Sequence, residues 1–281
     1  MADDSSNLWA RLTTAAVAIP LLLAALFWGG DLAVTAMIAG AAAVAGWDFC
    51  SIGYGDDLPA AIWVTSLACA GIVVAFLDDP TRGLETLVGA TLLLGGVCLF
   101  GHDDRDRVPV QYGTSCAALI YCGVFPAMLI PVYQQPERAF WVLMAMIVVW
   151  MSDTGAYFTG RAAGEHPLAP EISPNKTVEG AVGGFVGSLV GAFFCNWLFT
   201  RLAGRGPMAS WQTLSAGTVL LVAVPANLLA QSGDLVESLL KRAGGVDDSG
   251  SLLYGHGGIL DRIDGLLFAA PWFYTCALYF T

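Results

Sequence analysis

Long, uninterrupted apolar runs constrain this chain more than any other feature of its sequence. A helix needs about 20 apolar residues to cross a bilayer. Runs near that length lie at residues 12–28, 32–54, 60–77, 84–100, 110–133, 139–158, 178–200, 211–232 and 263–280. The strands of a membrane barrel would alternate polar and apolar residues, whereas a helix satisfies its own backbone hydrogen bonds in lipid. We therefore predict an all-α, polytopic integral membrane protein with about nine transmembrane helices.

The composition agrees with a membrane protein and excludes other classes. Hydrophobic residues fill 56% of the 281 positions and charged residues only 12%, outside the range of soluble domains. The net charge of −11 argues against a nucleic-acid partner, which demands a basic surface. The first apolar run follows an acidic segment without a clear cleavage site, so we expect a retained helix rather than a signal peptide.

The polar residues are unevenly distributed along the chain. Both lysines, Lys176 and Lys241, lie in the second half beside unusual polar clusters. No internal repeat or hydrophilic linker divides the chain. We therefore predict a single membrane domain over residues 1–281, in which 1–140 are mainly scaffold helices and 141–281 form a catalytic half.

The basic residues predict the orientation, because basic residues in short loops tend to stay in the cytoplasm. With nine helices, eight of the twelve Lys and Arg residues share the side of the N-terminus. These eight are Arg11, Arg105, Arg107, Arg161, Lys176, Lys241, Arg242 and Arg262. We therefore expect the polar loops at 159–177 and 233–262, and with them the active site, to face the cytoplasm.

Two polar clusters flank the loop at 159–177. In "WMSDTGAYFTGR", Asp153, Tyr157 and Arg161 recur every four residues and would share a helical face. A carboxylate there is costly in lipid unless it is paired or lines a wet cavity. In "APEISPNKTVEG", Ser173 and Pro174 suit the cap and first residue of a helix, whose free amides, together with Lys176, would favour an anion. The simpler alternatives are an interfacial acid and a snorkelling lysine.

The helix after this loop is rich in glycine. The stretch "EGAVGGFVGSLVGAFF" places Gly180, Gly184, Gly187 and Gly191 at helical spacings. Small residues at such spacings allow helices to approach closely in membranes. We expect a packing role here and no catalytic one.

Two further clusters lie near the C-terminus. In "SGDLVESLLKRAGGVDD", Asp234, Ser238, Lys241 and Arg242 fall along one helical stripe, which could hold a metal at one end and a phosphate at the other. The alternative is an amphipathic helix at the membrane surface. In "YGHGGILDRIDG", glycines surround His256, and Asp261 and Asp264 share a face at the start of the last helix.

Taken together, these clusters predict a divalent-metal site that handles phosphates. They supply at least four acids, Asp153, Asp234, Asp261 and Asp264, together with several cations. Oxygen ligands without thiolates or paired histidines suit Mg²⁺, or Mn²⁺, rather than zinc. Such a metal neutralises triphosphate oxygens, while lysine and arginine balance the charge of a departing group.

At these residues the sequence resembles the phosphatidate cytidylyltransferase (CDP-diacylglycerol synthase) family. The C-terminal signature of that family matches here, at the family's spacing, in Ser238, Lys241, Arg242, Asp248, His256, Gly257, Gly258, Asp261, Arg262 and Asp264. The "SDTGAYFTGR" and "SPNKTVEG" segments also look like their counterparts, so the resemblance covers about residues 150–265. Two positions depart from the pattern: Asp247 replaces a lysine, and Tyr254 replaces a proline or small residue. We expect Asp247 to alter CTP affinity or metal occupancy and Tyr254 to loosen the loop, and we expect rate and substrate to change rather than the class of reaction.

The resemblance implies a Mg²⁺-dependent nucleotidyltransferase of phospholipid biosynthesis that converts CTP and phosphatidic acid to CDP-diacylglycerol and pyrophosphate. It implies Asp234, Asp261 and Asp264 as catalytic metal ligands, with Asp248 as a lesser one, and Lys241 and Arg242 as catalytic cations. The substrate-binding residues implied are Lys176, Ser238, His256, Gly257, Gly258, Arg262, Asp153, Tyr157 and Asn175. It also implies a homodimer in a bacterial or archaeal inner membrane.

Other readings of the same residues remain open. A CTP-dependent lipid kinase of the polyprenol or phytol type would release CDP instead of pyrophosphate, and a CDP-archaeol-type synthase would use an ether lipid. An ion-coupled transporter also places acids within membrane helices, although its acids should be spread through the midplane. An inactive scaffold is the last alternative, and Asp247 is the residue that favours it.

Overall fold

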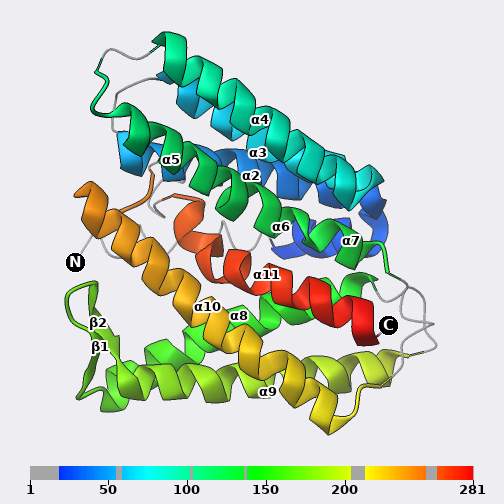
Figure 1. The fold of residues 1–281 in the computed structure, drawn as a ribbon. Helices are drawn as coiled ribbons and strands as arrows, with labels where there is room; N and C mark the ends of the chain where they lie inside the picture. The colour runs from blue at the N-terminus through cyan, green and yellow to red at the C-terminus, as the bar shows by residue number, and fades with distance from the viewer. Residues whose placement is uncertain are drawn as a thin grey trace. The chain divides into compact units, whose positions relative to one another are not determined.

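The computed structural model describes residues 19–54, 59–101, 104–135, 138–203, 213–250 and 258–280. The chain divides into two compact units, each described here by itself. Unit 1 comprises residues 1–123 and 246–262, and unit 2 comprises residues 124–245 and 263–281. Figure 1 shows the elements of both units as a ribbon. The single membrane domain, with its scaffold and catalytic halves, stays a prediction.

Helices dominate the described residues, which confirms the all-α fold class. Eight helical stretches among them are long and apolar enough to cross a membrane. They are Ile19–Tyr54, Pro59–Asp78, Pro80–Gly101, Val108–Tyr133, Ala139–Ala163, Val178–Leu202, Ala216–Gly244 and Leu260–Phe280. The chain is therefore a polytopic membrane protein.

The count of nine helices is not confirmed, because the first two predicted runs meet in one helical stretch. The π-helical turn η1 (Ala25–Gly29) leads into α2 (Gly30–Tyr54). Gly30, with φ of 68°, marks the break between them. A side chain at that φ would be strained, so glycine allows the chain to change direction between the two apolar runs.

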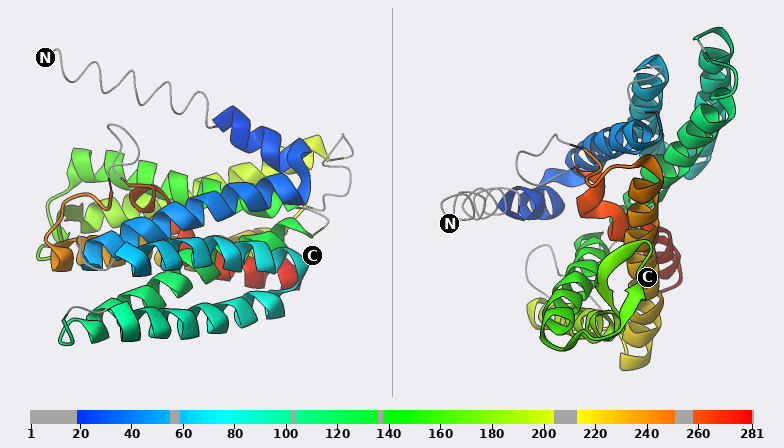
Figure 2. Two further views of the ribbon diagram at one scale, coloured as in Figure 1. Left: turned by 90° about the horizontal axis from the view of Figure 1, so that it is seen from above. Right: turned by 90° about the vertical axis from the view of Figure 1, so that its left-hand side faces the viewer.

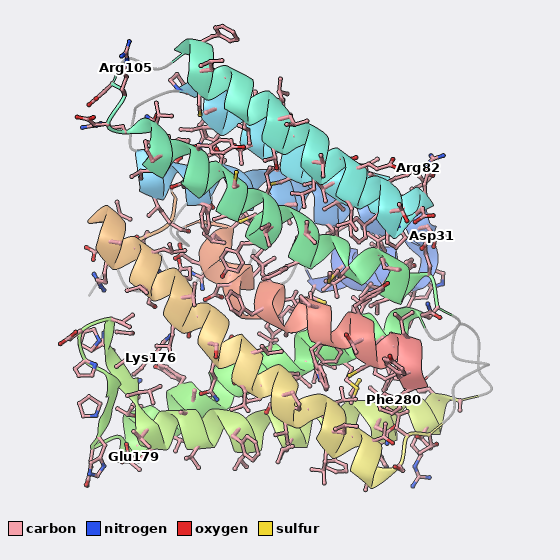
Figure 3. The ribbon with its side chains drawn as sticks, viewed as in Figure 1. Asp31, Arg82, Arg105, Lys176, Glu179 and Phe280 are labelled. Atoms are coloured by element: carbon pink, nitrogen blue, oxygen red, sulfur yellow. The ribbon has the colours of Figure 1, made fainter. Side chains whose placement is uncertain are left out.

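Unit 1 contains a bundle of neighbouring helices joined by short connections. After α2 follow α3 (Pro59–Asp78), α4 (Pro80–Gly101), α5 (Val108–Ala118) and the π-helical turn η2 (Leu119–Val124). α3 packs against both α2 and α4, and α5 packs against α2, as the two further views illustrate (Figure 2). Within this unit, the labelled Asp31 and Arg82 lie at one end of the helices and Arg105 at the other (Figure 3). Charged residues at the two ends of apolar helices are expected of a bundle that crosses a bilayer.

Buried hydroxyl groups tie the end of α2 to its neighbours in unit 1. The Tyr54 hydroxyl bonds the Gln111 carbonyl and the Ser115 hydroxyl on α5. Thr65 Oγ1 on α3 lies 2.8 Å from Ser115 Oγ. Since buried hydroxyls need partners, this network fixes the last turns of α2 against α3 and α5.

Unit 2 carries the remaining helices. They are α6 (Phe125–Ala127), α7 (Leu129–Tyr133), α8 (Arg138–Ala163), α9 (Val178–Leu202) and α10 (Ala216–Gly244), followed by α11 (Leu260–Phe280) from Ile263 onwards. α8 supplies the large buried side chains Phe140, Trp141 and Met144. α10 runs well beyond the predicted apolar run at 211–232, so the polar stripe from Asp234 to Arg242 is helical as expected.

The glycines of α9 lie against α8, as predicted. A Cβ atom on Gly184 would be 3.0 Å from the Ser152 carbonyl oxygen, and one on Gly191 would be 2.9 Å from the Met151 side chain. A Cβ on Gly187 would collide with the Met151 carbonyl oxygen. The two backbones therefore approach each other closely only because these positions lack side chains.

The segment between α8 and α9 corrects one prediction. Ser173 and Pro174 do not start a helix; they lie in β2 (Ser173–Thr177), which pairs antiparallel with β1 (Pro167–Ala169). The helix begins at Val178, and its cap is Thr177, whose Oγ1 accepts a hydrogen bond from the Gly180 amide at 3.0 Å. Thr177, with an extended backbone, satisfies the geometry of a cap, and the preceding residues pair as strands instead.

Gly187→Ala tests the close packing of α8 and α9. The added methyl group forces the Met151 backbone to move, so we expect a loss of about 1–3 kcal/mol of stability and a lower thermal midpoint in mild detergent. Gly89→Ala in α4 is the matched control, because a Cβ there meets nothing within 4 Å. Equal midpoints for the two variants would contradict the close-packing account.

Candidate functional site

A cavity of about 440 Å³ in unit 2 collects several of the predicted site residues. It is lined by residues of α8, α9, α10 and the β1–β2 hairpin. Its polar lining residues are Ser152, Asp153, Tyr157, Arg161, Asn175, Lys176, Thr177, Gln231 and Asp234. The structure thus brings together Asp153, Tyr157, Asn175, Lys176 and Asp234, which the sequence predicted from separate motifs.

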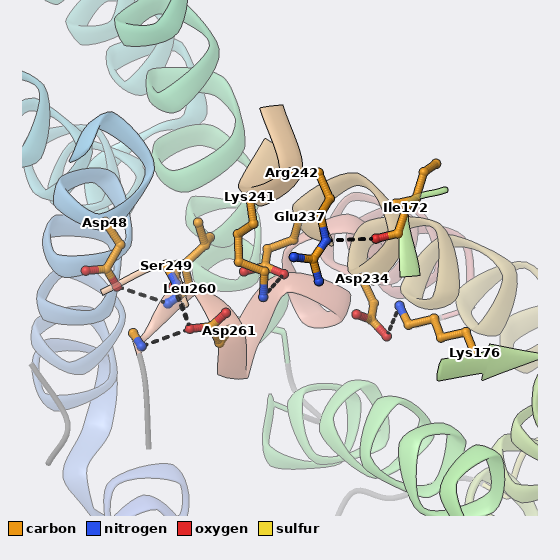
Figure 4. A network of polar contacts seen from close by, with 11 residues as sticks. Asp48, Ile172, Lys176, Asp234, Glu237, Lys241, Arg242, Ser249, Leu260 and Asp261 are labelled. Atoms are coloured by element: carbon orange, nitrogen blue, oxygen red, sulfur yellow. Dashed lines mark hydrogen bonds and ion pairs between the residues drawn. The ribbon is translucent and has the colours of Figure 1, made fainter. Parts of the chain in front are cut away.

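An ion pair between Lys176 and Asp234 spans this cavity. Lys176 Nζ on β2 lies 2.6 Å from Asp234 Oδ2 on α10, and Figure 4 shows the two groups facing each other. The lysine side chain is 25% exposed and the aspartate side chain 40% exposed. The Lys176 Nζ atom itself is buried, so each group compensates the charge of the other, and the partly exposed Asp234 side chain is the more accessible of the two.

Glu179 joins the two ends of the hairpin that carries Lys176. Glu179 in the first turn of α9 accepts hydrogen bonds from the amides of Glu165 and His166, at 3.1 and 3.2 Å. Its other oxygen lies 2.5 Å from His166 Nδ1. Figure 3 shows Lys176 and Glu179 near the same end of α9. The hydrogen bonds of Glu179 therefore fix the hairpin that carries Lys176.

A chain of side-chain hydrogen bonds lies beside the cavity, whose lining includes Ser152 and Gln231. Asn227 Nδ2 donates to Ser152 Oγ at 2.7 Å, and Gln231 Nε2 donates to Asn227 Oδ1 at 3.0 Å. Gln231 also donates to the Ala181 carbonyl at 3.1 Å. These bonds link α8, α9 and α10. Asn227 and Gln231 were missed in the sequence, although they lie two turns and one turn before Asp234 on the same helical face, which was a signal.

Three carboxylates meet at the side of the cavity near α11. Asp234, Glu237 and Asp264 each offer an oxygen, and these oxygens all lie within 4.8 Å of one another. Glu237 is only 1% exposed and bonds Lys241, with Oε2 and Nζ 2.7 Å apart. Glu237 was missed in the sequence, although it lies three residues after Asp234 and four before Lys241, on the same helical face. Its burial in the fold is what identifies it.

The remaining cations of the site lie on two helices. Arg242 Nε donates to the Ile172 carbonyl of the hairpin loop at 3.3 Å (Figure 4). Arg161 donates to the Tyr157 hydroxyl oxygen at 2.9 Å along α8. Ser238 is half-buried on α10, one turn after Asp234. Cationic or hydroxyl side chains are thus present on α8, on α10 and on the hairpin.

The other signature residues belong to unit 1. Asp261 Oδ2 accepts three hydrogen bonds, from the Ser249 amide at 3.1 Å, the Ser249 hydroxyl at 2.8 Å and the Gly258 amide at 2.9 Å. Asp248 and Arg262 are exposed. His256 and Gly257 lie outside the described residues, as does Tyr254. One oxygen of Asp261 therefore holds its own loop, and Gly258 serves that loop through its amide.

These features define an integral membrane protein with a polar, acid- and cation-lined cavity among apolar helices. The model of the Cytidylyltransferase family matches residues 9–280, so the chain belongs to that family. The match confirms the resemblance inferred from the signature residues.

Curated relatives agree with this assignment. A phosphatidate cytidylyltransferase of Thermotoga maritima is 36% identical over 194 residues, which cover 69% of this chain and 68% of the relative. One of Bacillus subtilis is 39% identical over 58% of this chain and 57% of the relative, and one of Haemophilus influenzae is 44% identical over 48% and 44%. The matched part spans about half the length of most of these relatives.

Thr177→Val tests the cap that fixes the start of α9 beside Lys176. Loss of the hydroxyl leaves the Gly180 amide without its bond, so we expect a loss of about 1 kcal/mol of stability, seen as a lower thermal midpoint in detergent. Thr177→Ser keeps the acceptor and should match the unsubstituted protein. If the valine and serine variants have the same thermal midpoint, Thr177 does not cap α9.

Proposed function

We propose that this protein is a phosphatidate cytidylyltransferase, which forms CDP-diacylglycerol and pyrophosphate from CTP and phosphatidic acid. One observation carries the proposal: the unit 2 cavity joins acids and cations, Lys176 with Asp234 above all, inside a membrane protein of the Cytidylyltransferase family. A lipid substrate fits a site among membrane helices, because its acyl chains can stay in the bilayer while the headgroup reacts.

The reaction requires positioning and charge neutralisation more than a strong base. An oxygen of the phosphatidic acid phosphate attacks the α-phosphorus of CTP, and the bond between that phosphorus and the oxygen bridging to the β-phosphorus breaks. Pyrophosphate leaves with the bridging oxygen. The attacking phosphate is already ionised near neutral pH, so aligned substrates and fixed charges supply the acceleration.

The cations of unit 2 are placed to hold phosphate groups. Lys176 lines the cavity, and Lys241 and Arg242 lie in the last turns of α10. Each is engaged with a protein partner, Asp234, Glu237 or the Ile172 carbonyl. We propose that a triphosphate takes over part of these contacts. Its negative charge then offsets the loss of each ion pair.

The acids of unit 2 fit a divalent cation. Asp234, Glu237 and Asp264 present oxygens close enough to share one ion with small adjustments, and carboxylates are the ligands that Mg²⁺ and Mn²⁺ prefer. When bound, the ion would neutralise phosphate oxygens of CTP as they develop charge. The protein's own contribution is to keep three carboxylates together beside Lys176 and Lys241. Asp153, which lines the same cavity, is a lesser candidate ligand, and the metal roles of Asp261 and Asp248 remain proposals from the family signature.

The distribution of basic residues supports a membrane location and an orientation for the protein. We propose that the protein lies in a cytoplasmic membrane, with the ends of α8 and α10 and the hairpin facing the cytoplasm, where CTP is available. The basic residues Arg161, Lys176, Lys241 and Arg242 all belong to these segments, as the positive-inside rule expects. A homodimer stays a prediction.

Product identity tests the proposal most simply. Purified protein in mixed micelles with labelled CTP, Mg²⁺ and phosphatidic acid should release pyrophosphate and form labelled CDP-diacylglycerol. Lys176→Met should lower the turnover by at least roughly tenfold, because a cation within the cavity is lost. Arg82→Met in unit 1 changes an exposed cation that pairs with Asp78 and should leave turnover unchanged.

Other products would contradict the assignment. Labelled CDP, formed with a lipid alcohol, would show a kinase. CDP-lipid formed only with an ether-linked phosphatidate would show an archaeol-type synthase. No product, while a family member is active in the same micelles, would favour a transporter or an inactive scaffold.

Glu237→Gln tests the acidic cluster directly. Removal of one carboxylate from three should weaken Mn²⁺ binding, followed by electron paramagnetic resonance, by roughly tenfold to a hundredfold, the range seen when even supporting groups of metal sites are removed. Glu85→Gln, an exposed acid on α4, is the matched control and should bind Mn²⁺ normally. Unchanged binding by both variants would exclude Glu237 from the metal site.

A further inference from the structure

Asp48 is a buried acid in the half of the chain predicted to be scaffold. It lies on α2, within a membrane-spanning stretch, and is only 2% exposed. An ionised carboxylate in such a place is costly unless nearby groups compensate its charge. The groups that compensate the Asp48 carboxylate therefore indicate its structural role.

The compensating groups belong to the segment that contains the family signature. Asp48 Oδ2 accepts a hydrogen bond from the amide of Leu260, the first residue of α11, at 3.3 Å, and Figure 4 shows this contact. The start of a helix has free amides and a partial positive charge, both of which favour an anion. Asp48 therefore acts as a cap for α11 supplied by a distant part of the chain.

Two glycines allow the signature segment to reach Asp48. A Cβ on Gly258 would lie 2.6 Å from Asp48 Oδ2, and a Cβ on Gly250 would collide with Asp48 Oδ1. Neither contact is possible for a residue with a side chain unless the backbone moves. The closeness of the carboxylate thus explains why glycine occupies these two positions.

The same short segment fixes the orientation of Asp261. Ser249, which precedes Gly250 in the chain, donates hydrogen bonds to Asp261 Oδ2 through its amide and its hydroxyl. The Gly258 amide donates a third hydrogen bond to the same oxygen. Asp48 is itself fixed, because α2 is tied to α3 and α5 by the Tyr54–Ser115–Thr65 hydroxyl network. All of these residues belong to unit 1.

We propose that Asp48 is a positioning residue for the nucleotidyl-transfer site. Its carboxylate contacts Gly250, Gly258 and Leu260, and so fixes the residues that present Asp261 in one orientation. The catalytic importance of Asp261 rests on the proposed function. The contact between Asp48 and the start of α11 does not depend on that function. Asp48 acts through this loop and touches no reacting atom.

Amide hydrogen exchange tests the contact without relying on activity. In Asp48→Leu, which keeps the branched shape and removes both acceptors, exchange of peptides covering Ser249, Gly258 and Leu260 should rise roughly tenfold to a hundredfold, as expected for loss of a charge-assisted hydrogen bond. Peptides from α9 should be unchanged. Asp48→Asn keeps one acceptor oxygen and should stay closer to the unsubstituted protein. Thr35→Val, a buried polar position several turns earlier on α2, is the control.

A second variant keeps the test decisive if Asp48→Leu does not fold. Gly250→Ala pushes the loop away from Asp48 and should raise exchange in the same peptides. In the double variant Asp48→Ala with Gly250→Ala, the smaller residue at position 48 makes room for the methyl group. The two effects should therefore be markedly less than additive.

The kinetic readout separates this inference from the proposed function. Asp48→Leu should lower kcat/KM for CTP at least roughly tenfold, with recovery in Asp48→Asn. If the unsubstituted protein makes no CDP-diacylglycerol, the proposed function fails while the exchange data still test Asp48. Unchanged exchange at Ser249, Gly258 and Leu260, a rise that extends equally over α9, or additive effects in the double variant would overturn the inference.

Discussion

The cost of placing a charged side chain within membrane-spanning helices determines how this protein is built. Three acids within those helices have a specific compensating group. Asp234 pairs with Lys176, Glu237 pairs with Lys241, and Asp48 caps the first residue of α11. Lys241 lies one turn after Glu237 on the same helix, whereas Lys176 and the Leu260 amide come from segments distant from Asp234 and Asp48. The contacts that make Asp234 and Asp48 tolerable therefore also join distant parts of the chain. Stability and the proposed chemistry therefore depend on the same residues.

Close packing and a short hairpin create the space in which these pairs form. The glycine face of α9 lies directly against α8, and α10 and the hairpin complete the lining of the cavity. The hairpin, braced by Glu179, returns Lys176 to Asp234. A triphosphate would meet cations that already have partners, which suggests that binding exchanges protein ion pairs for phosphate contacts rather than filling an open cationic pocket.

Sequence reasoning predicted the features that depend on local pattern. The apolar runs gave the helices, and helical spacing gave the glycine face and the stripe from Asp234 to Arg242. The β1–β2 hairpin was missed because Ser173 and Pro174 are typical of helix starts, while strand pairing is decided by residues across the turn. Asp48 was missed because it lies in an apolar run, and Glu237 was missed although it shares a helical face with Asp234 and Lys241. Only the tertiary contacts reveal the burial and the partners of these two acids. The motif match linked Asp153, Lys176 and Asp234 before their distances were known.

The central claim is that the acids of unit 2 hold a divalent ion which in turn binds CTP beside Lys176. Anomalous scattering from a crystal grown with Mn²⁺ and CTP measures this directly. The account predicts a manganese peak at about 2.1 Å, a coordination distance typical of such hard ions, from oxygens of Asp234, Glu237 and Asp264, with a CTP phosphate near Lys176 Nζ. A peak elsewhere, with these three carboxylates still bonded only to protein groups, would contradict it.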